Sequence, residues 1–112
     1  MSNDADNAMK LLEELKKGLV PFGKLTTYGS VGRVLGIEPQ EVGAACRILG
    51  ECDEAKELPY HRIIKQKGWL PIWFSAGGKR IHIKLLEQEG HKVEEIEGMH
   101  RVVDFEDYLS EP

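Results

Sequence analysis

The stretch TTYGSVGRVLGIEPQEVGAACRILG, residues 26–50, decides the fold that we expect for this chain. Thr26 or Thr27 can cap a helix that ends at Gly36, because a threonine hydroxyl accepts a hydrogen bond from an N–H group at the start of a helix. Pro39 then suits the first turn of a second helix. Two short helices joined by a tight turn are typical of a helix-turn-helix motif, which many DNA-binding proteins use.

Regular patterns continue on both sides of this pair. Before it, apolar residues at intervals of three and four predict an amphipathic helix, which Asp4, Asp6 or Asn7 can cap; they are Ala8, Leu11, Leu12, Leu15 and Leu19. After it, YHRII at 60–64 indicates a short strand and KRIHIKLLEQEG at 79–90 a fourth helix. After this helix, the stretches 91–98 and 101–109 indicate a short strand or extended piece and then a terminal segment that docks on the domain. We expect a mostly α fold with a short β element, in a single domain over 1–112.

The composition is that of an ordinary globular domain, with 112 residues of which 41% are hydrophobic. No run approaches the ~20 apolar residues of a membrane span, and the first ten residues lack a signal-peptide pattern, so we expect a soluble cytoplasmic protein. Two cysteines, Cys46 and Cys52, suit neither a disulfide scaffold nor a four-ligand zinc site. We expect both to remain thiols, and we expect no metal and no cofactor.

Charge is distributed unevenly along the chain, whose net charge is −4. Residues 15–37 contain four basic side chains and residues 59–86 contain six, and neither stretch has an acidic one. Residues 87–112 hold nine acidic side chains, so a basic centre is followed by an acidic C-terminal segment at about 91–112. This clustering is either accidental or marks a basic face for phosphates, and we favour the second interpretation.

The second helix of the pair carries three small residues in a row, Gly43, Ala44 and Ala45. Small side chains let a helix approach a wall closely, and that wall is either another helix or a narrow DNA groove. A helix with few long hydrogen-bond donors reads base edges in the major groove poorly. If this helix binds DNA, we therefore expect it to dock in the minor groove without strong sequence preference.

The motifs GKLTTYG, VGAACR, LPYHRII, KGWL, SAGGKR and LLEQEG stand in an order that resembles the alkylguanine-DNA alkyltransferases, which remove alkyl groups from the exocyclic oxygen of guanine. The resemblance covers about residues 8–92, and its most specific part is the Pro-x-His-Arg-hydrophobic motif at 59–63. It implies a winged-helix-like helix-turn-helix domain of the C-terminal alkyltransferase type. In those enzymes the second motif position is the acceptor cysteine, whereas here it is Tyr60. The chain thus resembles the alkyltransferase-like proteins, which keep the fold and the base-flipping site but lack the cysteine.

The resemblance also implies roles for residues near this motif. His61 and Glu89 match the pair that activates the cysteine through water in the enzymes, where a thiolate is the nucleophile. A tyrosine hydroxyl has a reference pKa of about 10 and stays protonated at neutral pH, so alkyl transfer to Tyr60 would be slow. We therefore expect a site that recognises an alkylated base and contains no catalytic residue.

The same resemblance implies a set of DNA-binding residues. Tyr28 matches a tyrosine placed against the phosphate beside the extruded nucleotide, and Arg47 matches an arginine that is a candidate phosphate contact. Gln40 stands where the family has an intercalating arginine and carries no charge, so we expect weaker base flipping. Ala44 completes the expected DNA-binding set.

We expect the base pocket between the motif and the stretch WLPIWFSAGG at 69–78. Aromatic rings can pack against a flat base, and a serine can donate to its exocyclic oxygen; alternatively, Trp69 and Phe74 belong to the core. The expected pocket residues are Pro59, Tyr60, His61, Arg62, Trp69, Phe74 and Ser75.

Three functions fit these observations. The one that we favour is a non-enzymatic sensor that binds duplex DNA through the minor groove, rotates an alkylated guanine into the pocket and flags it for other repair proteins, such as nucleotide-excision repair proteins or a nuclease. The second is a repair enzyme in which Tyr60 accepts the alkyl group, or which works with a separate nuclease. The third is a transcription regulator that uses the helix-turn-helix alone; the scarcity of long polar side chains on its second helix argues against it.

Overall fold

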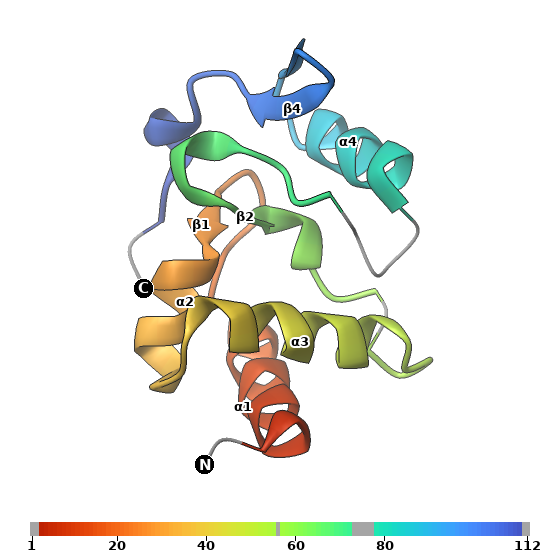
Figure 1. Cartoon of the computed structure of the whole chain (residues 1–112). Coiled ribbons are helices and arrows are strands. Elements are labelled where there is room, and N and C mark those ends of the chain that lie inside the picture. Colours follow the sequence, from red (N-terminus) through yellow and green to blue (C-terminus); the bar gives the residue numbers. More distant parts are fainter. Residues whose placement is uncertain (1–2, 56, 73–77, 111–112) are drawn as a thin grey trace.

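A computed structural model describes residues 3–55, 57–72 and 78–110. Its helices are α1 (Asp4–Lys16), α2 (Tyr28–Leu35), α3 (Pro39–Gly50) and α4 (Gly78–Gln88), and its strands are β1 (Thr26–Thr27), β2 (Ile63–Ile64), β3 (Val93–Ile96) and β4 (Met99–Val102). Figure 1 shows α1, α2 and α3 together at one end of the molecule, the β1–β2 pair in the middle, and α4 with the β3–β4 hairpin at the other end. The predicted mostly α fold with a short β element is confirmed.

The helix pair at residues 26–50 forms as predicted. The Thr27 hydroxyl caps α2 by accepting a hydrogen bond from the Ser30 N–H at 3.1 Å. Gly36 ends this helix with a φ of 75°, a left-handed conformation that favours glycine. Pro39 is the first residue of α3, and the Glu38 N–H donates to the Glu41 carboxylate at 2.9 Å.

Helix α1 packs across α3 and closes the first hydrophobic core. The prediction that Asp4, Asp6 or Asn7 caps this helix is wrong, because all three already lie inside it. Asn3 is the cap, and its side-chain oxygen accepts from the Ala5 N–H at 2.8 Å. The core that α1 shares with the helix pair contains Leu11, Leu15, Val31, Val42, Ala45, Cys46, Leu49, Tyr60 and Ile63.

Strand β2 connects this core to a second one. It pairs in parallel with β1, and its two isoleucines are both fully buried. Successive side chains of a strand point to opposite faces, so Ile63 joins the first core and Ile64 the second. The second core consists of Leu25, Ile64, Leu70, Leu86 and Val102, with Phe105, Tyr108 and Leu109 packed on it.

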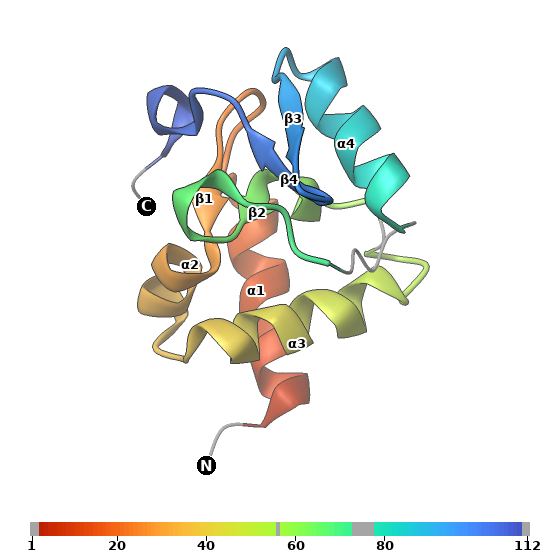
Figure 2. The same cartoon turned by 45° about the horizontal axis from the view of Figure 1, so that its top comes forward.

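The C-terminal part of the chain has more structure than its sequence indicated. The predicted short strand or extended piece is an antiparallel hairpin of β3 and β4, in which Val93 pairs with Val102. Figure 2 shows this hairpin beside α4, which contacts β3. The predicted strand at 60–64 is shorter than expected, because residues 60–62 form a 3-10 turn and only Ile63 and Ile64 pair with β1. Within the described residues, no helix is both long and apolar enough to cross a membrane.

Candidate functional site

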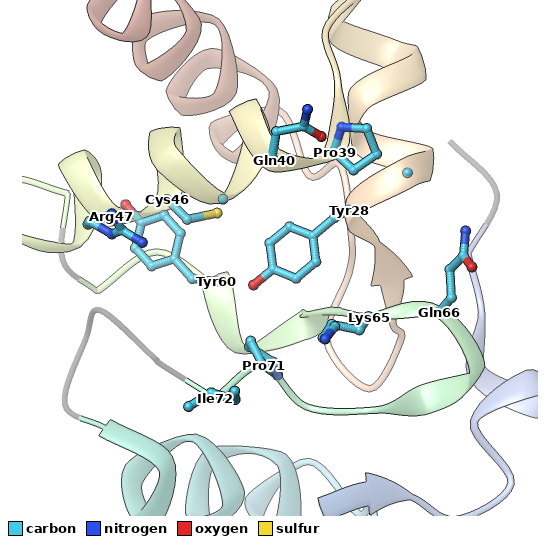
Figure 3. Close-up of a pocket in the computed structure, with 12 residues that line it drawn as sticks. Tyr28, Pro39, Gln40, Cys46, Arg47, Tyr60, Lys65, Gln66, Pro71 and Ile72 are labelled. Atoms are coloured by element: carbon cyan, nitrogen blue, oxygen red, sulfur yellow. The ribbon is translucent and has the colours of Figure 1, made fainter. Parts of the chain in front are cut away.

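A pocket of about 620 Å³ lies between α3, the start of α2 and the chain segment 65–72, as Figure 3 shows. Its α3 residues recur at intervals of three and four, which places them on one side of the helix. No acidic residue is among the described lining residues, which are Tyr28, Gly29, Pro39, Gln40, Gly43, Cys46, Arg47, Tyr60, Lys65, Gln66, Pro71 and Ile72. The lining combines apolar side chains with the cations Arg47 and Lys65, so the pocket is suited to a partly apolar ligand that carries negative charge.

Tyr28 stands in the middle of this pocket. It is the first residue of α2, directly after the capping residue Thr27, so the helix start fixes its direction. Figure 3 shows its ring between α3 and the segment 65–72. Burial, together with the nearby Cys46 thiol, raises the pKa of Tyr28 above its ordinary value of 10.0. Its hydroxyl therefore remains protonated at neutral pH and can donate a hydrogen bond to a phosphate or a base.

Tyr60 forms part of the same pocket wall, but its hydroxyl is engaged elsewhere. The residue is only 2% exposed, and its hydroxyl donates to the backbone carbonyl of Ala55. Burial raises the pKa of Tyr60 above its ordinary value, and the nearby Cys46 and Cys52 thiols raise it further. A protonated hydroxyl whose hydrogen is already donated to a carbonyl is a poor acceptor of an alkyl group.

Cys46 also lines the pocket, from the apolar side of α3. Burial raises the pKa of its thiol to about 12, so it is not a thiolate at neutral pH. The prediction that Cys46 and Cys52 remain thiols is confirmed. Cys46 was not among the residues expected in the pocket.

Behind Tyr60, the next two residues of the motif meet Glu89 in a buried charged network. His61 Nε2 donates to Glu89 Oε2 at 2.5 Å, and Arg62 Nε donates to Glu89 Oε1 at 2.9 Å. The Gly23 N–H donates to the same carboxylate at 2.9 Å, and Arg62 Nη1 donates to the Val20 carbonyl at 2.9 Å. Glu89 thus ties the motif to the loop between α1 and β1.

The network fixes the charge state of its members. Burial would raise the pKa of Glu89, but hydrogen bonds from Arg62, His61 and Gly23 outweigh it and lower the pKa to about 2. Burial lowers the pKa of His61, and its hydrogen bond with Glu89 only partly offsets that effect. At neutral pH the carboxylate is therefore ionised and paired with Arg62, while His61 is a neutral donor.

A second histidine, His82 of α4, lies beneath this network. It is fully buried, and its Nε2 donates to the His61 backbone carbonyl at 2.9 Å. Burial lowers its pKa to about 4, so it is neutral at neutral pH. His82 was not among the residues expected at the site, and its place on the apolar face of the predicted helix 79–90 was the available signal.

Four of the expected site residues line the pocket: Tyr28, Gln40, Arg47 and Tyr60. Ala44 is half-buried on α3 and is not among the described lining residues. Pro59, His61 and Arg62 are not among them either. Pro59 precedes the 3-10 turn, and this turn directs Tyr60 to the pocket and the next two side chains to Glu89.

The other expected pocket residues lie elsewhere. Trp69 is not among the described lining residues; its ring lies 5.2 Å from the Arg101 guanidinium, which supports packing as its role. Phe74 and Ser75 fall outside the described residues. Lys65, Gln66, Pro71 and Ile72 also line the pocket. None of the four was named as a site residue, although the pocket was expected between the motif at 59–63 and the stretch 69–78, which contains Pro71 and Ile72. The described residues contain no cluster of three or more His, Cys, Asp or Glu side chains that could hold a metal ion.

Comparison with known proteins is consistent with this geometry. The chain is 40% identical over 82 residues to a protein of Thermus thermophilus named DNA base-flipping protein. The aligned region covers 73% of this chain and 51% of that protein. This chain is also 32% identical over 87 residues to a methylated-DNA–protein-cysteine methyltransferase of Saccharolobus islandicus. That aligned region covers 78% of this chain and 52% of that protein. The chain thus spans about half the length of these curated relatives.

The fold is also found in a solved structure. The crystal structure of Schizosaccharomyces pombe Atl1 in complex with damaged DNA containing O6-carboxymethylguanine superposes with a TM-score of 0.77 over the full length of both chains, at 24% identity. Residues 7–91 match the sequence model of the family described as 6-O-methylguanine DNA methyltransferase, DNA binding domain. The chain therefore belongs to this DNA methyltransferase family through its DNA-binding domain.

Proposed function

We propose that this protein recognises alkylated DNA without reacting with it. It binds duplex DNA through the minor groove, turns an alkylated guanine into the pocket and presents the complex to other repair proteins, such as nucleotide-excision repair proteins or a nuclease. The observation that carries the proposal is Tyr60, a buried tyrosine whose hydroxyl is bound to the Ala55 carbonyl, at the position where the resemblance has an acceptor cysteine. The name of the Thermus relative and the damaged DNA bound by Atl1 support the same function.

The charges around the pocket fit a duplex whose phosphates lie along its rim. Arg47 on α3 and Lys65 on the opposite wall are both exposed and both line the pocket. Extruding a base costs a few kcal/mol of stacking and pairing, which contacts to the twisted backbone partly offset. Tyr28 lies between the two cations and is the best placed residue to donate to the phosphate beside the extruded nucleotide.

No carboxylate is among the described lining residues, so the acidic C-terminal segment adds no negative charge to the described lining. Phosphate contacts are independent of sequence, so we expect binding to unmodified duplexes as well, with strong dependence on salt. The preference for a modified over an unmodified duplex then comes from the pocket. There Tyr28, Tyr60 and the apolar residues Pro71 and Ile72 can pack against the base and its alkyl group.

The experiment compares two otherwise identical duplexes, with and without one O6-methylguanine. Wild-type protein should bind the modified duplex more tightly, and the intact-protein mass should not change after incubation. A mass increase of one methyl group on the wild type would contradict the proposal and indicate an enzyme. Equal affinity for both duplexes would indicate general DNA binding.

A matched variant, Tyr60→Cys, separates recognition from chemistry. The cysteine would stand next to His61, and its side chain would lack the phenol that reaches Ala55. We expect it to accept the methyl group at least slowly, because a neighbouring base favours the thiolate. An unmodified Tyr60→Cys protein that still binds the lesion would show that His61 and Glu89 serve only to hold the fold.

A further inference from the structure

The pocket wall opposite α3 is the chain segment 65–72, which has little regular structure of its own. It supplies Lys65, Gln66, Pro71 and Ile72 to the pocket. Two hydrogen bonds close its turn: the Lys65 N–H donates to the Trp69 carbonyl at 2.8 Å, and the Gly68 N–H donates to the Lys65 carbonyl at 3.3 Å. A short loop of this kind orders poorly unless other parts of the protein hold it.

The C-terminal segment, residues 93–110, packs against the outside of this wall. The Leu70 N–H donates to the His100 carbonyl at 2.9 Å, and Trp69 and Arg101 form an antiparallel bridge, so β4 pairs with the wall. The Arg101 guanidinium lies 5.2 Å from the centre of the Trp69 ring, and Glu94 holds it at 2.7 Å.

Phe105 makes a second contact with the wall, at Gly68. A Cβ atom placed on Gly68 would lie 2.6 Å from Phe105 Cδ1, so the phenyl ring rests directly on the glycine backbone. The residues that follow Phe105 are anchored to the strand region: the Leu25 N–H donates to the Tyr108 carbonyl at 2.9 Å, and the Ser110 N–H donates to the Leu25 carbonyl at 2.8 Å. Phe105 is thus fixed between the wall and β1.

Neither Arg101 nor Phe105 is among the described residues that line the pocket, and both lie beyond the family match, which ends at residue 91. We propose that the C-terminal segment positions the pocket wall: Arg101 and Phe105 hold residues 65–72 in the shape that an extruded, alkylated guanine requires. This inference rests on the proposed function. It adds two positioning residues that act through Trp69 and Gly68 rather than by touching the base.

The physical reason is that two kinds of binding make different demands on the wall. An unmodified duplex is held mainly by phosphate contacts, which tolerate small displacements. An extruded base must fit between α3 and the wall, and a site that is slightly too loose loses affinity because binding must first order it. Loosening the wall should therefore weaken lesion binding while leaving general DNA binding nearly unchanged.

The test compares Phe105→Ala and Arg101→Ala with wild type on duplexes with and without O6-methylguanine. Each variant should lose about tenfold in preference for the modified duplex, an effect of ~1.4 kcal/mol. Affinity for the unmodified duplex should change by less than about twofold for Phe105→Ala, which alters no charge. Phe105→Leu should restore most of the preference, since it keeps apolar volume on Gly68, whereas Arg101→Lys should not, because lysine cannot stack on the Trp69 ring as a planar guanidinium does.

Leu12→Ala on α1 is the control for a loss of stability alone, because Leu12 packs on the first core and not on the wall. Amide hydrogen exchange at Lys65, Gly68 and Leu70 should quicken in Phe105→Ala but not in Leu12→Ala. If Phe105→Ala keeps the wild-type preference, or loses no more of it than Leu12→Ala, the positioning role is refuted while the proposed function stands. If the wild type itself shows no preference for the modified duplex, the proposed function fails first and this inference with it.

Discussion

The two sides of the turn at residues 60–62 are built from neighbouring residues but differ in polarity and in charge. On one side, Tyr60 faces the pocket among apolar groups and Cys46, with its hydroxyl bound to a backbone carbonyl. On the other side, His61 and Arg62 meet the ionised Glu89, whose carboxylate accepts hydrogen bonds from two side chains and one backbone N–H group.

This difference changes how the retained histidine and glutamate are interpreted. By resemblance, His61 and Glu89 match the pair that activates a cysteine in the enzymes, and here Tyr60 stands in the place of that cysteine. In this structure the two residues have a role that requires no reaction. Glu89 links Arg62 and His61 to Gly23 by hydrogen bonds, and Arg62 also donates a hydrogen bond to the Val20 carbonyl. A network that holds the α1–β1 loop against the motif has a structural reason to persist when the acceptor residue is different.

The largest effect should follow from removing the centre of the network. Glu89→Ala leaves Arg62 Nε, His61 Nε2 and the Gly23 N–H without their acceptor, and breaking a buried ion pair in this way costs about 3–5 kcal/mol. Glu89→Gln keeps an oxygen acceptor and should cost less. Denaturant unfolding measures both, with the exposed Glu87→Gln on α4 as the control. A change of less than ~1 kcal/mol for Glu89→Ala would show that the network does not hold the fold.

Acid should weaken the network side before it affects the pocket side. The pKa of His82 is lowered from 6.5 to about 4, so between these values the unfolded chain binds a proton that the folded chain does not. The free energy of unfolding should therefore fall as the pH is lowered through this window, by up to ~1.4 kcal/mol per pH unit for one proton. Glu89, with its pKa lowered from 4.5 to about 2, extends the fall below pH 4.5.

The acid effect is checked by denaturant unfolding at a series of pH values. His82→Asn should lower stability at neutral pH, because the fit around the His61 carbonyl is disturbed, but it should flatten the dependence between pH 6.5 and 4. An unchanged slope in this variant would assign the proton uptake to other groups.

On the pocket side, removal of one hydroxyl should have a smaller effect. Tyr60→Phe leaves the Ala55 carbonyl without its donor and should lower the free energy of unfolding by about 1–2 kcal/mol. Because the hydroxyl points to Ala55, preference for a modified duplex should survive. Loss of that preference, with the fold intact by circular dichroism, would show that the hydroxyl contacts the base.

The smallest expected effect concerns the rim of the pocket. Gln40→Arg adds a cation and a planar group at the start of α3, and we expect tighter binding to the modified duplex by roughly 1 kcal/mol, part of the cost of flipping. A fluorescent base analogue at the lesion position reports extrusion. Arg47→Ala is the counterpart, and it should weaken binding to both duplexes and lower the salt slope by about one unit. If Gln40→Arg raises the affinity for both duplexes equally, the new arginine contacts phosphates in general and does not promote base flipping.

The sequence alone determined the elements whose signals are local. Thr27, Gly36 and Pro39 act on the backbone within a few residues, so the bounds of α2 and α3 followed from them. The motif at 59–63 and Glu89 indicated the family through residue types at characteristic distances along the chain, and of these residues Tyr60 lines the pocket.

Only the tertiary structure decided how these residues divide between two sides of one turn. No local pattern could indicate that Tyr60 donates to Ala55, that Lys65 and Ile72 complete a pocket with α3, or that the C-terminal segment pairs with Leu25 and Leu70. These contacts join segments that the helices and strands bring together, and their energies come from burial and hydrogen bonding in the folded chain. Local sequence patterns therefore predicted the helix pair and the family, whereas packing between distant segments decided which residues form the walls of the site.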